Sequence, residues 1–211
     1  MKNTEKKYGL AIHTTSPELG LAISNFDEYT RSQTWNLGRD LSNNLHQKLQ
    51  EFILPQIWQD LSFITVAKGP GSFTGTRIGV VTARTLAQQL NIPLFAISTL
   101  ATIAWSYKQK SHNLFLQMHA QRGQLFTAIY QVEEMGINPI SGDTLMNPLV
   151  WEKMLVDWDN SYHLIQVKNS LGKYVVSLLE LAHLEWQKGN RPHWSEALPF
   201  YGQSPVEKYP L

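Results

Sequence analysis

The fold of this chain is decided by the stretch Lys68-Gly69-Pro70-Gly71-Ser72-Phe73-Thr74-Gly75-Thr76-Arg77. An apolar run at residues 63–67 precedes it and predicts a buried strand. Residues 78–91 follow it and predict a helix. A strand, a glycine loop and a helix in this order point backbone N–H groups at the helix N-terminus, where an anion is favoured.

The spacing of these glycines does not match the two common phosphate motifs. Three residues separate Gly71 from Gly75, one more than G-x-G-x-x-G requires, and Thr76 stands where a Walker A loop has lysine. A tight turn that lets the helix pack closely is therefore the simpler interpretation. If the loop does hold phosphate, the candidate residues are Gly69, Gly71, Ser72, Gly75, Thr76 and Arg77.

The composition limits the possible functions. The apolar share is 43% and the net charge is +1, which gives no electrostatic footprint for nucleic acid or an anionic membrane. Cysteine is absent, so disulfides, thiolate nucleophiles and cysteine-ligated zinc are excluded. No apolar run approaches the roughly 18 residues of a membrane span. We therefore expect a cytoplasmic protein that does not enter a membrane.

The order of predicted elements indicates an α/β fold. The first half begins with three predicted strands, at residues 8–14, 19–24 and 28–35. A helix at 41–58, a strand at 63–67, a helix at 78–91 and a strand at 93–97 follow. The first connections are too short for a crossover, so these strands form an antiparallel meander. This pattern is typical of one half of the actin-like ATPase (ribonuclease H-like) architecture.

The pattern repeats incompletely after a boundary near residue 107. A helix at 99–105 ends the first half. After the boundary, strands are predicted at residues 114–118, 124–131 and 163–167, and helices at 150–156 and 174–188. Residues 133–148 are rich in glycine, asparagine and proline and are predicted to be irregular. We expect an N-terminal subdomain, 1–107, and a smaller, degenerate C-terminal subdomain, 108–211, that ends in an irregular tail.

The stretch from Lys68 to Gly79 resembles the G-P-G-S-F-T-G-x-R-I-G signature of the TsaB (YeaZ) family. Four further segments extend the resemblance over most of the chain. Residues 10–15 resemble that family's A-I-D-T-S strand, and residues 98–100 resemble its S-T-L. Residues 118–126 resemble its I-D-A-R-x-G-E-V-Y hairpin, and residues 196–201 resemble its closing P-x-Y. The resemblance implies a shortened, non-catalytic relative of TsaD, the enzyme that transfers threonylcarbamoyl to an adenosine of tRNA.

The resemblance also implies partners. TsaD would bind helices of the first subdomain, the ATPase TsaE would join, and the isolated chain would form a homodimer through the same surface. Contact with tRNA would be made mainly by TsaD. No cofactor of its own is expected, and ATP or ADP at the shared interface is left open. Small residues recur every four positions on one helix, so we expect the TsaD-binding surface to contain Leu45, Leu49, Gly79, Ala83 and Ala87.

Several charged family positions differ here. His13 and His119 replace aspartates, Gln121 replaces an arginine and Gln124 replaces a glutamate. A carboxylate at position 13 would help to hold Mg²⁺-nucleotide, and imidazole substitutes poorly for it. This difference argues against independent nucleotide hydrolysis. Sequence drift in a non-catalytic scaffold and adaptation to a new ligand would each explain the replacements. The two histidines end strands and would meet across a cleft, as hydrogen-bonded rather than catalytic groups.

Other enzyme classes have less support. The seven histidines include no pair at helical ligand spacing, so no metal site is expected. G-x-S-x-G is absent, which argues against a serine hydrolase or peptidase. The alternative to a scaffold is an independent actin-like ATPase or sugar-kinase-like enzyme that uses Gly69–Gly75 as a phosphate cradle.

Overall fold

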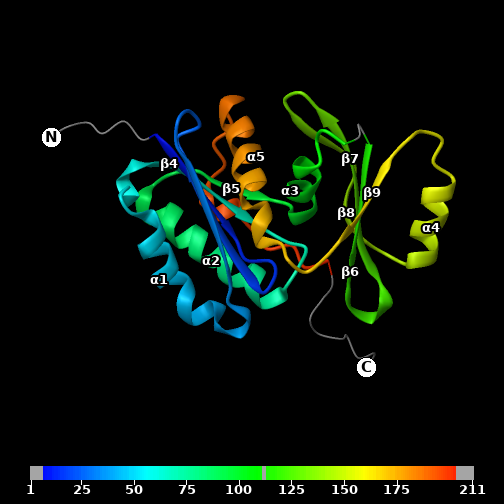
Figure 1. The fold of residues 1–211 in the computed structure, drawn as a ribbon, viewed down its shortest axis with the longest axis horizontal. Helices are drawn as coiled ribbons and strands as arrows, with labels where there is room; N and C mark the ends of the chain where they lie inside the picture. The colour runs from blue at the N-terminus through cyan, green and yellow to red at the C-terminus, as the bar shows by residue number, and fades with distance from the viewer. Residues whose placement is uncertain (1–6, 111–112, 203–211) are drawn as a thin grey trace.

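The computed structural model describes residues 7–110 and 113–202 and contains two β-sheets (Figure 1). The first sheet has the order β3-β2-β1-β4-β5. Its strands are β1 (Tyr8–His13), β2 (Glu18–Ser24), β3 (Thr30–Asn36), β4 (Leu61–Ala67) and β5 (Leu94–Ile97). The second sheet has the order β8-β7-β6-β9. Its strands are β6 (Asn113–His119), β7 (Leu125–Glu133), β8 (Gly136–Met146) and β9 (His163–Val167).

The first sheet confirms the predicted meander. β1 pairs antiparallel with β2, β2 pairs antiparallel with β3, and β4 and β5 continue the sheet in parallel. Leu10 and Ile12 alternate with Ala11 along β1, so the strand presents large side chains to one face and a small one to the other. α1 (Leu41–Ile53) and α2 (Phe73–Leu90) cover the face with the large side chains.

The helix α2 begins five residues earlier than the sequence predicted, at Phe73 rather than Ile78. The Ser72 side chain accepts a hydrogen bond from the Gly75 N–H at 3.2 Å and caps the helix. Glycine and threonine are weak helix formers, which hid this first turn. The glycine loop proper is therefore only Lys68 to Ser72.

The second sheet corrects one prediction. Residues 133–148 are not irregular, because β8 occupies Gly136–Met146 and pairs antiparallel with β7. The pairing contains register shifts near Ile129, and β8 lies at the edge of the sheet. Proline and glycine are tolerated at edges and bulges, so the composition that suggested a loop is compatible with this strand.

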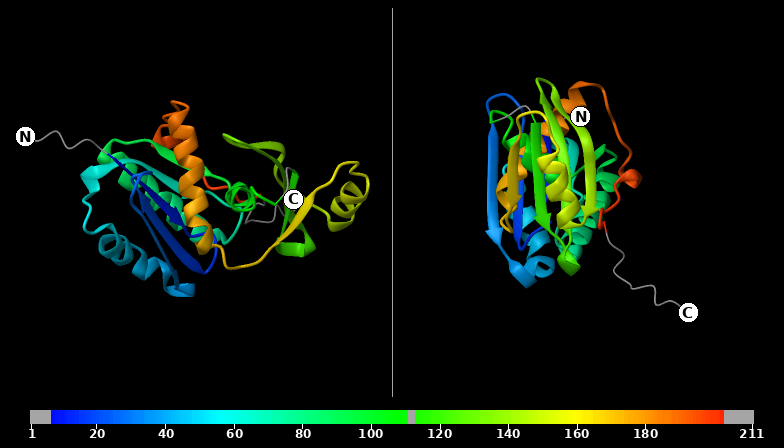
Figure 2. Two further views of the ribbon diagram at one scale, coloured as in Figure 1. Left: turned by 45° about the horizontal axis from the view of Figure 1, so that its top comes forward. Right: turned by 90° about the vertical axis from the view of Figure 1, so that its right-hand side faces the viewer.

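The helix that follows the strands of one sheet in the sequence packs against the other sheet. α5 (Val175–Gln187) packs its buried face against the first sheet, while α3 (Thr99–Ser106) packs against the second. The two helices lie side by side in the middle of the molecule (Figures 1 and 2). α4 (Pro148–Val156) covers the outer face of the second sheet through Trp151.

The layers are therefore α1 and α2, the first sheet, α5 with α3, the second sheet, and α4. The strands of the first sheet precede residue 107 and those of the second sheet follow it, but α3 and α5 each pack against the sheet of the other half. Residues 197–202 have no regular structure, and 203–211 of the predicted tail lie outside the described residues. Among the helices of the described ranges, none is long and apolar enough to cross a bilayer.

Candidate functional site

The glycines of the opening stretch pack against the β1–β2 turn. A Cβ atom on Gly71 would lie 2.2 Å from the Thr15 carbonyl oxygen, and one on Gly75 would lie 2.1 Å from that of Thr14. A Cβ on Gly79 would lie 2.0 Å from the Thr14 hydroxyl oxygen. Only glycine permits this approach. The glycines thus bring α2 into contact with β1.

The backbone of the loop is hydrogen-bonded to other parts of the chain. The Ser72 N–H donates to the Thr15 carbonyl at 2.7 Å, and the Gly69 carbonyl accepts from the Thr99 N–H at 2.8 Å. The Lys68 carbonyl accepts from the Phe200 N–H at 2.6 Å. A phosphate cradle needs converging free N–H groups. Carbonyl oxygens of the turn lie against the loop instead, and this geometry supports the packing interpretation.

The two remaining loop candidates behave differently. Thr76 is buried and its hydroxyl donates to the Ser72 carbonyl at 2.7 Å, whereas Arg77 is exposed on α2. A pocket of about 430 Å³ lies beside this start of α2 and is lined by Ser72 and Thr74 together with Arg39 and Ser42. An anion held by this part of the chain would be placed there rather than in the loop itself.

His13 and His119 end corresponding strands in the two sheets but have opposite environments. His13 is 0% exposed, and neither ring nitrogen has a hydrogen-bond partner among the described residues. Burial lowers the pKa of its imidazole to about 3, so the ring is neutral at physiological pH. His119 is exposed. The expected hydrogen bonding of His13 is therefore wrong.

Gln121 and Gln124 lie on the β6–β7 turn, which has left-handed backbone at Arg122 and Gly123. Gln121 is exposed and Gln124 is partly buried. Within residues 7–110 and 113–202, no group of three or more histidine, aspartate or glutamate side chains is arranged to hold a metal ion.

A polar cluster that the sequence did not reveal joins the two sheets. The Asp143 carboxylate on β8 accepts from the Ser98 hydroxyl at 2.8 Å and from the Tyr130 hydroxyl at 3.2 Å. Ser98 also caps α3, because its oxygen accepts from the Ala101 N–H at 3.1 Å. We call Ser98, Tyr130 and Asp143 the Ser98 clamp. The sequence could have suggested only the cap, since Asp143 falls in the region predicted to be irregular.

The charges in the Ser98 clamp follow from its burial. Burial raises the pKa of the Asp143 carboxyl, although hydrogen bonds from Ser98 and Tyr130 and the nearby Lys68 charge act in the opposite direction. Burial, with the Asp143 charge, also raises the pKa of the Tyr130 phenol, so this hydroxyl stays protonated and donates. The Ser98 clamp therefore links β5 and α3 to the edge of the second sheet.

The residues predicted for the TsaD-binding surface are not on a surface. Leu45, Leu49, Gly79, Ala83 and Ala87 are all buried within the chain. Small residues at helical spacing let α2 approach the first sheet closely, rather than a partner helix. This part of the sequence prediction is wrong about which face is exposed.

The exposed face of α2 carries other residues. Phe73 is 40% exposed and Val81 is 53% exposed. The exposed Arg77 lies between them and the exposed Thr85 follows them, so the four residues are spaced four positions apart. We call Phe73, Arg77, Val81 and Thr85 the α2 strip. Two large apolar side chains, Leu54 and Ile57, are also exposed after the end of α1.

Comparison with known proteins identifies the family. Residues 45–169 match the family model "TsaD: tRNA N6-adenosine threonylcarbamoyltransferase". The chain is 34% identical over 171 residues, 79% of its length, to the "tRNA threonylcarbamoyladenosine biosynthesis protein TsaB" of Bacillus subtilis, of which 74% is covered. The chain belongs to the TsaB family.

Further relatives agree with this membership. The TsaB of Escherichia coli is 32% identical over 135 residues, which are 56% of this chain and 57% of that protein. The structure of YeaZ from Pseudomonas aeruginosa superposes with a TM-score of 0.80 at 21% identity, over 92% of this chain and 99% of that one. The predicted fold class is confirmed: the chain has the actin-like (ribonuclease H-like) fold of the TsaB/YeaZ family.

Proposed function

We propose that this protein acts in the biosynthesis of threonylcarbamoyladenosine in tRNA, as a non-catalytic partner that TsaD needs for activity. The observation that carries the proposal is the 34% identity to a TsaB protein over 171 residues. TsaE would join the assembly, the isolated chain would form a homodimer, and the chemistry would take place on TsaD.

The geometry around the glycine loop and His13 supports a role without catalysis. The glycine loop is packed against Thr14 and Thr15, and its carbonyl groups are bonded to Thr99 and Phe200. Where an actin-like ATPase would need a carboxylate for its metal, His13 is buried and neutral. The chain on its own would therefore require no cofactor.

The α2 strip is the surface that we assign to TsaD. It replaces the buried set Leu45, Leu49, Gly79, Ala83 and Ala87. Val81 lies in the middle of the strip and is the more exposed of its two large apolar side chains. Exposed apolar side chains of this kind commonly become the buried centre of a protein interface.

Co-purification with TsaD tests both the partner and the surface. Val81→Asp places a charge at the centre of the α2 strip and should abolish the complex while the fold is retained. Leu149→Asp is the matched control, since Leu149 is 74% exposed on α4, and it should bind like the unaltered chain. Ala83→Arg is unsuitable, because Ala83 is fully buried and the variant would unfold.

The three possible failures are distinct. If the unaltered chain neither captures TsaD nor restores threonylcarbamoyladenosine to the tRNA of cells that lack their own TsaB, the proposed function is wrong. If Val81→Asp binds normally, only the α2 strip is wrong. If Leu149→Asp also loses the complex, the effect of Val81→Asp is not specific to the strip.

The pocket beside Ser72, Thr74 and Arg39 is the one observation that favours the alternative, an independent nucleotide-using enzyme. Calorimetric titration of the isolated chain with Mg-ATP separates the two functions. Tight binding that Arg39→Ala abolishes would favour the enzyme. Absence of binding to the chain alone, with activity only in the presence of TsaD, would favour the scaffold.

A further inference from the structure

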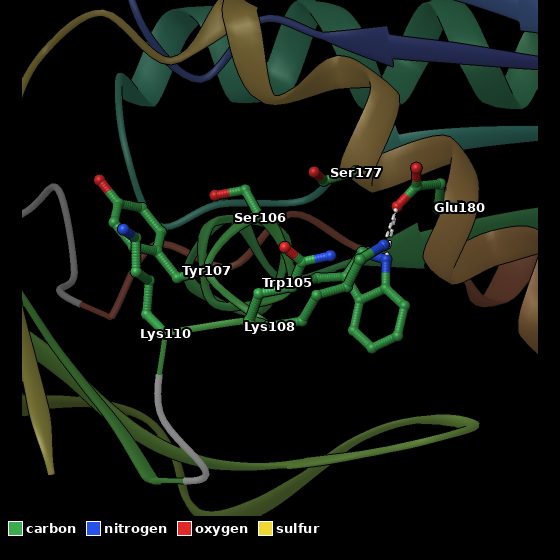
Figure 3. A pocket seen from close by; sticks show the side chains of 8 residues that line it. Trp105, Ser106, Tyr107, Lys108, Lys110, Ser177 and Glu180 are labelled. Atoms are coloured by element: carbon green, nitrogen blue, oxygen red, sulfur yellow. Dashed lines mark hydrogen bonds and ion pairs between the residues drawn. The ribbon is translucent and has the colours of Figure 1, made fainter.

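A second pocket, distant in sequence from both the glycine loop and the α2 strip, opens between α3 and α5 (Figure 3). It has a volume of about 400 Å³, within the range of small-ligand sites. One wall is the end of α3 and the turn that follows it, from Trp105 to Lys110. Ser177 and Glu180 of α5 form the opposite wall. We call this cavity the Lys108 pocket.

One side of the Lys108 pocket is held in place by a shared carboxylate. The same Glu180 oxygen accepts from the Trp105 indole N–H at 2.7 Å and from the Lys108 ammonium at 2.9 Å. The ammonium also lies 4.3 Å from the centre of the Trp105 ring. Lys108 is therefore fixed at the wall with its charge paired to Glu180, which leaves Lys110 as the basic residue of the lining that has no ion-pair partner among the described residues.

The remaining polar groups favour an anion. Of the described residues that line the pocket, Lys108 and Lys110 are basic and Glu180 is the single acid, so the lining carries one net positive charge. Ser177 adds a hydroxyl group from the α5 wall, whereas the Ser106 hydroxyl already donates to the Ile103 carbonyl at 2.7 Å. Ammonium and hydroxyl donors together are suited to phosphate oxygens, which accept several hydrogen bonds at once.

Tyr107 forms an aromatic side of the Lys108 pocket. The Tyr107 ring points towards Lys110 (Figure 3), and its phenol is hydrogen-bonded to that of Tyr174. Burial, and then the neighbouring Tyr107, raise the pKa of Tyr174 to about 12, so the Tyr174 phenol stays protonated near neutral pH. A flat aromatic surface beside an ammonium group, here Tyr107 beside Lys110, is a combination that binds nucleotides.

The acidic residues nearby limit where the phosphate can bind. A second cavity shares Trp105, Lys108 and Gln109 with the Lys108 pocket but is lined by Glu133 and Glu134 on its far side. Two carboxylates there would repel a phosphate. Phosphate is therefore expected at the Lys110 end of the pocket, away from these two carboxylates and from Glu180 (Figure 3).

We propose that the Lys108 pocket binds the phosphate group of a ribonucleotide, with the Lys110 ammonium contacting its oxygens. The phosphate could come from an RNA backbone or from a free nucleotide. The RNA source rests on the proposed function in tRNA modification, while phosphate binding itself does not.

The Trp105 indole N–H is a direct reporter, because it is hydrogen-bonded to Glu180 within the pocket. Its NMR signal in the ¹⁵N-labelled full chain would be followed during titration with inorganic phosphate, with AMP and with a short single-stranded RNA. Saturable movement of this signal is expected. Saturation by phosphate and AMP at similar concentrations to RNA would indicate a free nucleotide, and RNA binding at least tenfold tighter than AMP would indicate RNA.

Lys110→Met should weaken the binding of the preferred probe about tenfold, because it removes a charge-assisted contact from an exposed position without affecting the core. Lys153→Met is the matched control, an exposed lysine on α4 outside the pocket, and should leave the affinity unchanged. For RNA, the slope of log affinity against log salt should decrease by about one in Lys110→Met.

Two results would overturn the proposal. One is that none of the three probes moves the Trp105 signal saturably. The other is that Lys110→Met binds as tightly as the unaltered chain. Because Lys110 is not on the α2 strip, Lys110→Met should still co-purify with TsaD, so failure of the pocket and failure of the TsaD partnership give different outcomes.

Discussion

The two halves of the chain begin alike and diverge after their fourth strands. In the first half, β4 is followed by the glycine loop, α2 and β5 before the chain leaves the sheet. In the second half, β9 leads directly into α5, which crosses to the first sheet, so one helix and one strand have no counterpart. The second half is therefore smaller because, after its fourth strand, it lacks counterparts of α2 and β5.

The connection that follows β4 and the connection that follows β9 both pack against the β1–β2 turn. Gly71 and Gly75 pack against it from one side. From the other side, the Leu171 N–H donates to the Ser16 hydroxyl of the turn at 3.3 Å. The Gly172 N–H donates to the Glu18 carboxylate on β2 at 3.0 Å, and a Cβ on Gly20 of β2 would lie 2.2 Å from the Gly172 carbonyl oxygen. The comparison teaches that the chain itself fills the space around this turn. Tight packing in the first half should therefore contrast with tolerance in the second.

The largest expected effect is at glycines. Gly79→Val should lower the free energy of unfolding by about 3 kcal/mol, because its Cβ would overlap the Thr14 hydroxyl, which is fixed by its own hydrogen bond to Gly75. On β8, a Cβ on Gly142 would meet no atom within 4 Å, so Gly142→Val should change stability by less than about 0.5 kcal/mol. Urea unfolding measures both. Equal losses would remove the contrast between the halves.

The next effect is a pH dependence. His13 is neutral in the folded chain, whereas the unfolded chain binds a proton on it near pH 6.5, so acid favours unfolding. Below pH 6, stability should fall with a slope that approaches about 1.4 kcal/mol per pH unit from this group, down to its folded pKa of about 3.

His13→Leu should remove that part of the slope between pH 7 and pH 4.5, as measured by urea unfolding at a series of pH values. His119→Leu, at the corresponding but exposed position of β6, should keep the slope of the unaltered chain. A His13→Leu curve parallel to that of the unaltered chain would show that His13 titrates normally and is not enclosed.

The smallest effect concerns the Ser98 clamp, where the halves meet. Ser98→Ala removes both the cap of α3 and a donor to Asp143, and should cost about 1.5 kcal/mol. Tyr130→Phe removes only a donor and should cost about 1 kcal/mol. Thermal unfolding measures both. A Ser98→Ala variant as stable as the unaltered chain would mean that the clamp does not stabilise the contact between the halves.

The sequence predicted most elements because their apolar periodicity is local. The meander formed by β1 to β3 and the helix α5 were found within a few residues of their ends. Two predictions failed where local signals conflict. Ser72 caps a first turn rich in poor helix formers, and β8 contains Pro139 and Gly142 because it lies at an edge.

The site was harder to predict, because periodicity shows that a face is apolar or small but not what covers it. Ala83 and Ala87 looked like a docking face and instead contact the first sheet. Asp143 becomes a partner of Ser98 only after the two sheets pack together, 45 residues apart in sequence. The buried state of His13 likewise depends on its distant neighbours rather than on its own strand.

The exchange of α3 and α5 between the sheets has a consequence for synthesis of the chain on the ribosome. The first sheet is complete in sequence at Ile97, yet one face stays uncovered until α5, which starts at Val175, has emerged. At about 5–20 residues per second, that face is open for several seconds or longer. Chaperones would meet it in that interval, and a chain that stops after the first subdomain should aggregate rather than fold.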